Sequence, residues 1–438
     1  MGASEELARF GCGEALIPDD VRAVATTLIA NYLAWTISAA ANPEVARLSA
    51  ALVSLGSDGS VSTAATGEMM GPIWAATVNG AAAAIADYGD FHPDAAMEVG
   101  AVVVPAALAV GEMTDCAYAD LVDAVAVGAE VALRIGMGLQ PSHGTRGWDA
   151  STTCGGVGAA IAAGRLLRLD PERMTMAVAL GATQASGVLA SRGTLGRVLQ
   201  RGHAAGLGVE SALLASVGLT GATASIEGRR GLGALTSREP AFAAMVADLG
   251  QTWGLSDTVL KPYACSWEFQ SVIAAALRVR SRLPEGAVVE AVDVLGTAFP
   301  PDWTQSEVLD EFSARFSLAY CLQSGLRDGA VGPQQFSADR FAGAGNDNPS
   351  VRLHPIADGE AGLEMLKVQV VGCPVMTEVV TDDWIRPAPD PAAAGLRSRL
   401  ESAVVPVLGP LSGALVDLLL DPGDRRVRDI WRLIHQQT

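Results

Sequence analysis

The spacing of apolar residues predicts that most of the first 256 residues are helical. Asp19 and Asp20 suit the start of a helix, and apolar side chains then recur three and four positions apart from Val21 to Leu33. The same period returns in five later segments separated by Gly, Pro and Asp, namely Tyr118 to Met137, Val157 to Leu169, Met174 to Leu189, Ala204 to Val217 and Pro240 to Leu249. We therefore expect a large all-helical domain.

The pattern changes after Lys261. One more helix is predicted over about 268–282, a strand over 288–297 and a helical segment over 312–325. Apolar and polar residues alternate from Leu366 to Val370, and Val375 to Thr381 follows a proline, which predicts a hairpin. The segment 341–349, which contains Gly and Asn, reads as a loop. These elements predict a smaller α+β lid domain over residues 266–391.

The last part of the chain returns to the helical period. A proline-rich segment at 386–391 reads as a linker, and residues 393–434 are helical in pattern. If these closing helices pack on the first domain, the lid is an insertion. The predicted fold is therefore mainly α, with a helical domain of residues 1–265 and 392–438 and an α+β lid of residues 266–391.

Composition narrows the range of partners. The 30 basic and 48 acidic residues give a formal net charge of −18, and no run of Lys or Arg offsets it. Nucleic acid and an anionic membrane surface are therefore disfavoured as partners. The 48 glycines and only 5% aromatic residues favour helices packed closely through small side chains. The glycines from Gly155 to Gly158 follow no predicted strand, so we assign them to such packing and not to a nucleotide loop.

Cysteine usage and the first residues favour a reducing compartment. The six cysteines are scattered singly, with no C-x-x-C pair, as expected of free thiols. Residues 1–13 contain no apolar signal region, and apolar runs such as 101–110 are shorter than the roughly 20 residues of a membrane span. We expect a cytoplasmic protein that does not interact with membranes.

Three polar stretches interrupt the apolar sequence and are candidates for a site. They are residues 87–94 with Glu98 beyond them, residues 143–149, and residues 261–265. Each one alone could be a capped helix start at the surface. Polar side chains among core helices must find partners or line a cavity, so the three stretches together predict one pocket containing acids, bases and cations.

At these stretches the chain resembles the MmgE/PrpD family, which includes 2-methylcitrate dehydratase, cis-aconitate decarboxylase and iminodisuccinate epimerase. The shared landmarks occur in order along the chain: the acidic loop at 87–90, V-V-P-A-A-L-A at 103–109, R-G-W at 146–148, G-R-L-L-x-L-D at 164–170, G-L-T-G at 218–221, I-E-G-R-R-G at 226–231, L-K-P-Y at 260–263 and F-S-L-A-Y at 316–320. The resemblance implies a helical domain, an α+β lid, a cleft between them, a homodimer, and chemistry without a cofactor on a small carboxylic acid.

The resemblance also implies site residues, some retained and some changed. The family's aspartate, lysine and lid tyrosine fall on Asp87, Lys261 and Tyr320. Its two histidines for proton transfer fall on acids, Glu98 and Asp149. Further family positions, a lysine and two histidines, fall on Arg197, Gln200 and Gln270. These departures leave the reaction open.

The residue types permit acid and base chemistry on a carboxylic acid. Glu98 or Asp149 would be the base, with Trp148 as an apolar wall. Tyr320 would donate to the leaving group or only pack. The other candidates bind substrate: Lys261, Arg146 and Arg197 as cations for its carboxylate, and His92, His143 and Gln270 as lining residues.

Several functions fit these residues. The first is a cofactor-independent dehydratase that removes water from a β-hydroxy carboxylic acid, such as a larger acid in a tailoring pathway. An epimerase or isomerase would return a proton to the same carbanion, and a decarboxylase would form it by losing CO₂. A ligand-binding homologue without catalytic activity is the alternative from another class. No metal is expected.

Overall fold

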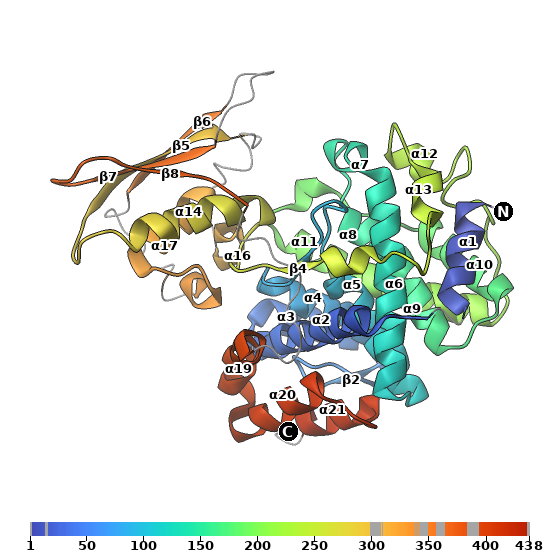
Figure 1. Ribbon diagram of the computed structural model, residues 1–438. Coiled ribbons are helices and arrows are strands. Elements are labelled where there is room, and N and C mark those ends of the chain that lie inside the picture. Colours follow the sequence, from blue (N-terminus) through green and yellow to red (C-terminus); the bar gives the residue numbers. More distant parts are fainter. Residues whose placement is uncertain are drawn as a thin grey trace.

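The computed structural model describes residues 2–13, 16–297, 308, 310–337, 340, 349–355, 364–382 and 394–435. As predicted, this part of the chain is mainly helical, and a smaller α+β part lies to one side of a large helical body (Figure 1).

The body is built from long helices whose small and branched apolar residues share one core. These helices are α2 (Asp19–Ser38), α4 (Pro72–Ile85), α5 (Gly100–Thr114), α6 (Tyr118–Leu139), α9 (Gly155–Leu166), α10 (Pro171–Thr183) and α11 (Leu195–Ser216). Shorter elements cover them: α1 (Ala3–Cys12), α3 (Pro43–Ser54), α7 (Ser142–Thr145), α8 (Ala150–Thr153), α12 (Leu232–Thr236), α13 (Phe242–Val246) and the strands β1 (Asp58–Ser62) and β2 (Met69–Met70).

Glycine lets the body helices touch along their backbones. A Cβ on Gly158 of α9 would collide with the carbonyl oxygen of Gly128 on α6, and a Cβ on Gly202 of α11 would collide with the carbonyl of Thr77 on α4. Only glycine permits these approaches. The run from Gly155 to Gly158 therefore serves helix packing, as its sequence context suggested.

The α+β part contains one sheet of four strands in the order β6 (Ser350–Pro355), β5 (Val289–Thr297), β7 (Met365–Val370) and β8 (Met376–Val379). Strands β5 and β6 are parallel, while β7 pairs antiparallel with both β5 and β8. The hairpin predicted from alternation is thus confirmed. Helices α14 (Gln270–Arg280) and α17 (Leu318–Asp328) share a second apolar core with this sheet.

Two segments that follow the start of the α+β part pack against the core of the helical body. Phe312 in the short helix α16 (Glu311–Ala314) and nearby Phe316 belong to the core of the helical body. The closing helices α19 (Ala394–Leu408), α20 (Ser412–Leu420) and α21 (Val427–His435) also return to that core. This return is the packing expected of an inserted lid, although the precise domain boundaries stay a prediction.

Some predicted boundaries are wrong. The helix predicted to reach residue 189 ends at Thr183, and the one predicted from Ala204 already begins at Leu195. The single helix predicted over 312–325 is two, because Ser317 caps a new start by accepting a hydrogen bond from the backbone N–H of Tyr320. Except for its last residue, Pro349, the predicted loop at 341–349 lies outside the described residues, as does the predicted linker at 386–391.

Two described segments, Asp19–Ala41 and Gly395–Leu420, are long and apolar enough to cross a membrane by length and composition alone. This differs from the expectation that all apolar runs are too short. In the first segment 78% of the most apolar window is buried inside the protein, as in a core helix of a folded domain. Such helices are weak evidence for a membrane span.

Candidate active site

A two-residue strand pair brings two of the predicted polar stretches together. Strand β3 (Asp90–Phe91) pairs antiparallel with β4 (Val259–Leu260), and the backbone N–H of Lys261 donates to the carbonyl of Gly89 at 3.0 Å. Lys261 therefore emerges beside the acidic loop, although about 170 residues of chain separate them. Backbone hydrogen bonds therefore hold the acidic loop next to the segment that carries Lys261.

Asp87 stands at a sharp turn after α4. Its φ of 45° lies in the left-handed region, which aspartate tolerates better than most residues. The turn places the carboxylate inside the protein, where Oδ1 lies 3.1 Å from the ammonium nitrogen of Lys261. Its second oxygen, Oδ2, is buried and has no hydrogen-bond partner among the described residues. One oxygen of this carboxylate is therefore available to a bound molecule.

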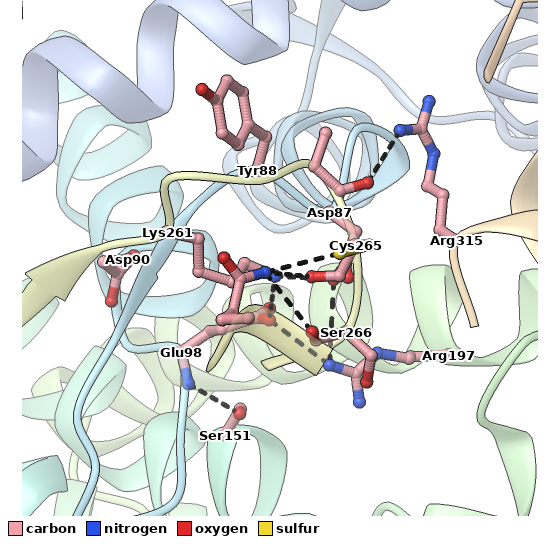
Figure 2. Close-up of polar contacts among 12 residues, drawn as sticks. Asp87, Tyr88, Asp90, Glu98, Ser151, Arg197, Lys261, Cys265, Ser266 and Arg315 are labelled. Atoms are coloured by element: carbon pink, nitrogen blue, oxygen red, sulfur yellow. Dashed lines mark hydrogen bonds and ion pairs between the residues drawn. The ribbon is translucent and has the colours of Figure 1, made fainter. Parts of the chain in front are cut away.

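Glu98 reaches the same lysine from the start of α5. Asp90 accepts hydrogen bonds from the backbone N–H groups of Val99 and Gly100, which anchors this end of the helix. The Glu98 Oε1 then lies 3.0 Å from Lys261 Nζ, and the buried lysine bridges two carboxylates (Figure 2). Lys261 has no exposed surface at all.

The remaining polar stretch, residues 143–149, supplies Asp149, whose carboxylate contacts two arginines of α11. Arg197 and Arg201 are four positions apart and so lie on the same face of the helix. Their Nη1 atoms lie 3.2 Å and 2.8 Å from the two oxygens of Asp149. Both arginines also contact Glu98, at 3.4 Å and 3.6 Å. Three acids and three cations thus form one buried network, which we call the charged cluster: Asp87, Glu98, Asp149, Arg197, Arg201 and Lys261.

The ion pairs of the cluster favour the ionised forms of Glu98, Asp149 and Lys261. Burial alone would raise the pKa of Glu98, but the charges of Lys261, Arg197 and Arg201 outweigh it and hold the pKa far below the ordinary value. The pKa of Asp149 is lowered in the same way, against burial, by the two arginines. Burial would lower the pKa of Lys261, but Asp87 and Glu98 raise it. Lys261 is therefore a cation held in a water-poor site, and Glu98 and Asp149 are weak bases.

These shifts predict how the cluster responds to pH. A carboxylate whose pKa is lower in the folded state than in the unfolded state stabilises the protein at pH values above its unfolded-state pKa. This stabilisation is lost as the pH falls toward the pKa of the folded state. The ordinary values are 4.5 for Glu98 and 3.8 for Asp149. We expect the advantage of wild type over Glu98→Gln, measured as free energy of unfolding in urea, to be constant from pH 5 to 8 and to shrink below about pH 4.5. An advantage that grew with acid would contradict this assignment.

Arg399 of the closing helix α19 holds the two loops that carry Asp87 and Lys261. Its guanidinium donates to the main-chain carbonyls of Lys261 at 2.9 Å and Tyr88 at 2.7 Å, and to the side-chain oxygen of Asn31 at 2.9 Å. It also lies 3.6 Å from the centre of the Tyr88 ring. Arg399 is therefore a positioning residue.

Replacing Arg399 by alanine is expected to lower the free energy of unfolding by about 2 kcal/mol, because three acceptors lose a charged donor. The matched control is Arg397→Ala on the same helix, whose partners Glu401 and Asp417 are exposed ion pairs. Its expected cost is at most about 1 kcal/mol. Equal costs for the two variants in urea unfolding would show that Arg399 does not hold the loops.

The structure does not bring three of the predicted residues to the charged cluster. The hydroxyl of Tyr320 donates to the carbonyl of Gln335 at 2.8 Å, within the second core. Arg146 is exposed and donates to the carbonyl of Leu235. His92 is buried and binds main-chain groups of its own loop and of Gly254. Their local contacts account for them as packing, surface and loop residues.

Three others lie next to the cluster or support it. The His143 Nε2 lies 2.8 Å from Thr153 Oγ1, and burial lowers the pKa of this histidine to about 4. Trp148 precedes Asp149 and packs 6.3 Å from the His143 ring. The side chain of Gln270 bonds only to the segment that follows Lys261, including the carbonyl of Cys265 at 3.1 Å. It positions that segment.

Sequence reasoning left out two arginines that the structure places at the site. Arg201 was not named among the predicted site residues, but its burial and its contact with Asp149 make it a full member of the cluster. Arg315 was missed, although it directly precedes the F-S-L-A-Y landmark. It is buried between α16 and the segment after Lys261 (Figure 2). Within the described ranges, no group of three or more His, Cys, Asp or Glu residues is arranged to hold a metal ion.

Three curated relatives give the chain its context. It is 29% identical over 300 residues to cis-aconitate decarboxylase of Aspergillus terreus, covering 65% of this chain and 61% of the relative. It is 27% identical to the cis-aconitate decarboxylase-like protein oryM of Aspergillus oryzae (63% and 60%) and 27% identical to human cis-aconitate decarboxylase (59% and 56%). The match thus spans about six-tenths of the length of these relatives.

The family comparison covers the part of the chain that contributes most of the charged cluster. The model of the MmgE/PrpD N-terminal domain matches residues 7–245, more than half of the chain. This range includes five of the six cluster residues and the polar stretches at 87–98 and 143–149. The resemblance drawn from the landmarks is confirmed, and the chain belongs to the MmgE/PrpD family.

Proposed function

We propose that this protein is a cofactor-independent lyase acting on a carboxylic acid, and that its first candidate reaction is the removal of water from a β-hydroxy acid. One observation carries the proposal: the buried ammonium of Lys261 lies 3.1 Å from Asp87, whose second oxygen has no hydrogen-bond partner among the described residues. An acid and a base thus stand side by side in a site shielded from water.

The pair can complete an elimination. Asp87 accepts the proton from the carbon next to the carboxylate, and the C–H electron pair forms the double bond as the C–O bond breaks. Lys261 donates a proton to the departing hydroxide, which leaves as water. The protonated Asp87 then returns its proton to the neutral amine of Lys261, so the site is restored without another proton source. Glu98 and Asp149, which the sequence offered as bases, serve instead as counter-ions because their pKa values are lowered.

Decarboxylation is the second candidate, and the names of the relatives favour it. It needs no base: the bond to the carboxylate breaks, CO₂ leaves, and Lys261 protonates the carbanion. The amine must then recover a proton from water. Both reactions place Lys261 as the proton donor, and only elimination makes Asp87 essential as an acceptor.

Mass spectrometry of a hydroxy-acid panel tests the proposal, with wild type, Lys261→Ala and Asp87→Asn compared. Lys367→Ala is the matched control, because Lys367 is the other lysine of the chain and lies on β7 of the sheet. We expect wild type and the control to form a product that is lighter than the substrate by one water. Lys261→Ala and Asp87→Asn are expected not to form it.

Other outcomes would redirect the assignment. Loss of CO₂ that survives Asp87→Asn would select the decarboxylase. An unchanged mass with uptake of deuterium from solvent would select an epimerase. Binding without any change of mass across the panel would leave a ligand-binding homologue. Asp87→Asn keeps the size of the side chain, so it remains informative if Lys261→Ala does not fold.

A further inference from the structure

The charged cluster is closed to solvent. All six of its residues are buried, and Lys261 has no exposed surface. A ligand that arrives from solvent cannot touch the Lys261 ammonium or the Asp87 carboxylate while the surrounding segments stay in place. Some part of the cover over the cluster must therefore move before any ligand can bind.

The segment that follows Lys261 crosses between the two apolar cores. Residues 265–269, which we call the connecting segment, begin beside the cluster, where Cys265 lies close to Lys261 (Figure 2). Cys265 and Phe269 belong to the second core, while the ring of Trp267 stacks on Phe91 of β3 at 4.2 Å. Parts with separate cores move relative to each other more readily than parts that share one. The connecting segment is thus placed to leave the cluster together with the second core.

An ion pair fastens the connecting segment to the helical body. The Arg192 Nη2 donates to Glu268 Oε1 at 2.6 Å, and Glu268 Oε2 accepts from the Ser266 hydroxyl at 2.6 Å. Burial alone would raise the pKa of Glu268, but Arg192 and Ser266 outweigh it and hold the pKa below the ordinary value. Glu268 is therefore a carboxylate at neutral pH, with both oxygens engaged.

The arginine of this pair stands on an anchored loop. Arg192 lies between α10 and α11, in a loop where the backbone N–H of Asp149, a cluster residue, donates to the carbonyl of Gly187 at 3.2 Å. Glu268 lies on a single short turn, Trp267–Phe269. When the pair separates, we therefore expect Glu268 to move and Arg192 to stay with the body.

The exposure of this pair suits it to opening. The side chains of Arg192 and Glu268 are 16% and 20% exposed, so water can solvate both charges when they separate. The ion pairs of the charged cluster differ, because separating them would leave buried charges without partners. The Arg192–Glu268 pair can therefore open and close at a modest cost.

We propose that the connecting segment is the gate to the charged cluster and that the Arg192–Glu268 ion pair is its latch. While the latch is closed, the cluster is shielded from water. When it opens, a ligand reaches Lys261 and Asp87. Arg192 and Glu268 are positioning residues in this proposal. The gate serves any ligand of the cluster, so the inference goes beyond the proposed reaction and does not depend on it.

The thiol of Cys265 reports opening in the absence of substrate. It is fully buried, and burial raises its pKa well above the ordinary value, so iodoacetamide reacts with it only in the open state. Mass spectrometry of the digested protein gives the alkylation rate of each cysteine separately. We expect Glu268→Gln to speed alkylation of Cys265 about fivefold, as for the loss of one partly exposed ion pair. Alkylation of Cys154, in the core of the helical body, should not change.

Further variants separate a latch from a general loosening. Arg192→Gln removes the same contact from its other side, so the double variant is expected to match either single variant. High salt should speed alkylation of Cys265 in wild type but not in Glu268→Gln, because it screens only an intact pair. Arg352→Gln is the matched control, since it breaks an exposed pair with Asp293 on the sheet and should leave the Cys265 rate unchanged.

Equal alkylation of Cys265 in wild type and in the latch variants would overturn the inference. An equal rise at Cys154 would also overturn it, because the whole protein would then be loosened. If Glu268→Gln does not fold, Arg192→Gln gives the same test. The proposed function fails separately, since labelling needs no turnover: a latch effect without turnover of the hydroxy-acid panel defeats only the lyase, and turnover without a latch effect defeats only the gate.

Discussion

Replacing Lys261 by methionine is expected to lower the free energy of unfolding by about 3–5 kcal/mol, the usual cost of removing one partner from a buried ion pair. The lysine is fully buried and lies within 3.1 Å of both Asp87 and Glu98. Methionine fills most of the same space, so the cost comes from two carboxylates that lose their cation and not from a cavity. Chemical unfolding monitored by circular dichroism measures it.

A double variant separates charge from packing. Adding Glu98→Gln to Lys261→Met removes one of the stranded charges, so the double variant is expected to recover at least about 1 kcal/mol relative to the sum of the single variants. Additive costs would mean that Lys261 and Glu98 do not interact as the 3.0 Å contact indicates. Lys367→Met on β7 serves as the lysine control and is expected to stay within about 0.5 kcal/mol of wild type.

The second large effect is expected at Asp149. Asp149→Asn keeps the size of the side chain and can still accept the hydrogen bond from the backbone N–H of Ser151 that caps α8. It removes the charge that Arg197 and Arg201 share, and an amide N–H then faces one of the guanidiniums. We expect a loss of about 3 kcal/mol in the free energy of unfolding.

Asp123→Asn is the matched control for Asp149→Asn. Asp123 binds Arg22 through both oxygens, at 2.8 Å and 3.2 Å, but this pair is partly exposed. Its loss is expected to cost at most about 1 kcal/mol. Similar costs for the two variants would indicate that burial of the charged cluster contributes little to its strength.

The helical part of the fold was predictable because its apolar period is long and regular. The hairpin β7–β8 was also predictable from a regular pattern: apolar and polar residues alternate along β7, and their burial alternates in the same way. Boundaries failed where a single side chain decides them. α16 ends at Ala314, and Ser317 begins α17 by a cap that no periodicity reveals.

Part of the site was also predictable. Asp87, Glu98, Asp149 and Lys261 stand out as polar residues in apolar sequence, and the structure does bring them together. Which of these residues contact one another was not predictable. The contacts depend on the strand pair β3–β4, which has two residues in each strand and is too short to produce a recognisable sequence pattern. Sequence reasoning therefore could not separate the buried acids that pair with cations from a free base.

Tyr320 and Arg315 show the opposite errors. Tyr320 matches a family landmark, yet its hydroxyl is used by the carbonyl of Gln335. Arg315 directly precedes the same landmark and was passed over, because only the structure shows that it is buried next to the segment after Lys261. A sequence shows the charge of a residue but not whether that charge is compensated.

The clamp formed by Arg399 sets an order of events for folding on the ribosome. Its two carbonyl acceptors, on Lys261 and Tyr88, were synthesised 138 and 311 residues earlier. The helices before residue 260 can collapse around their apolar core long before Arg399 emerges, because domains fold as their sequence becomes available. Until then the loops that carry Asp87 and Lys261 lack one of their anchors. The helical body therefore precedes the fully anchored site, and acquisition of activity during synthesis should lag behind acquisition of helical structure.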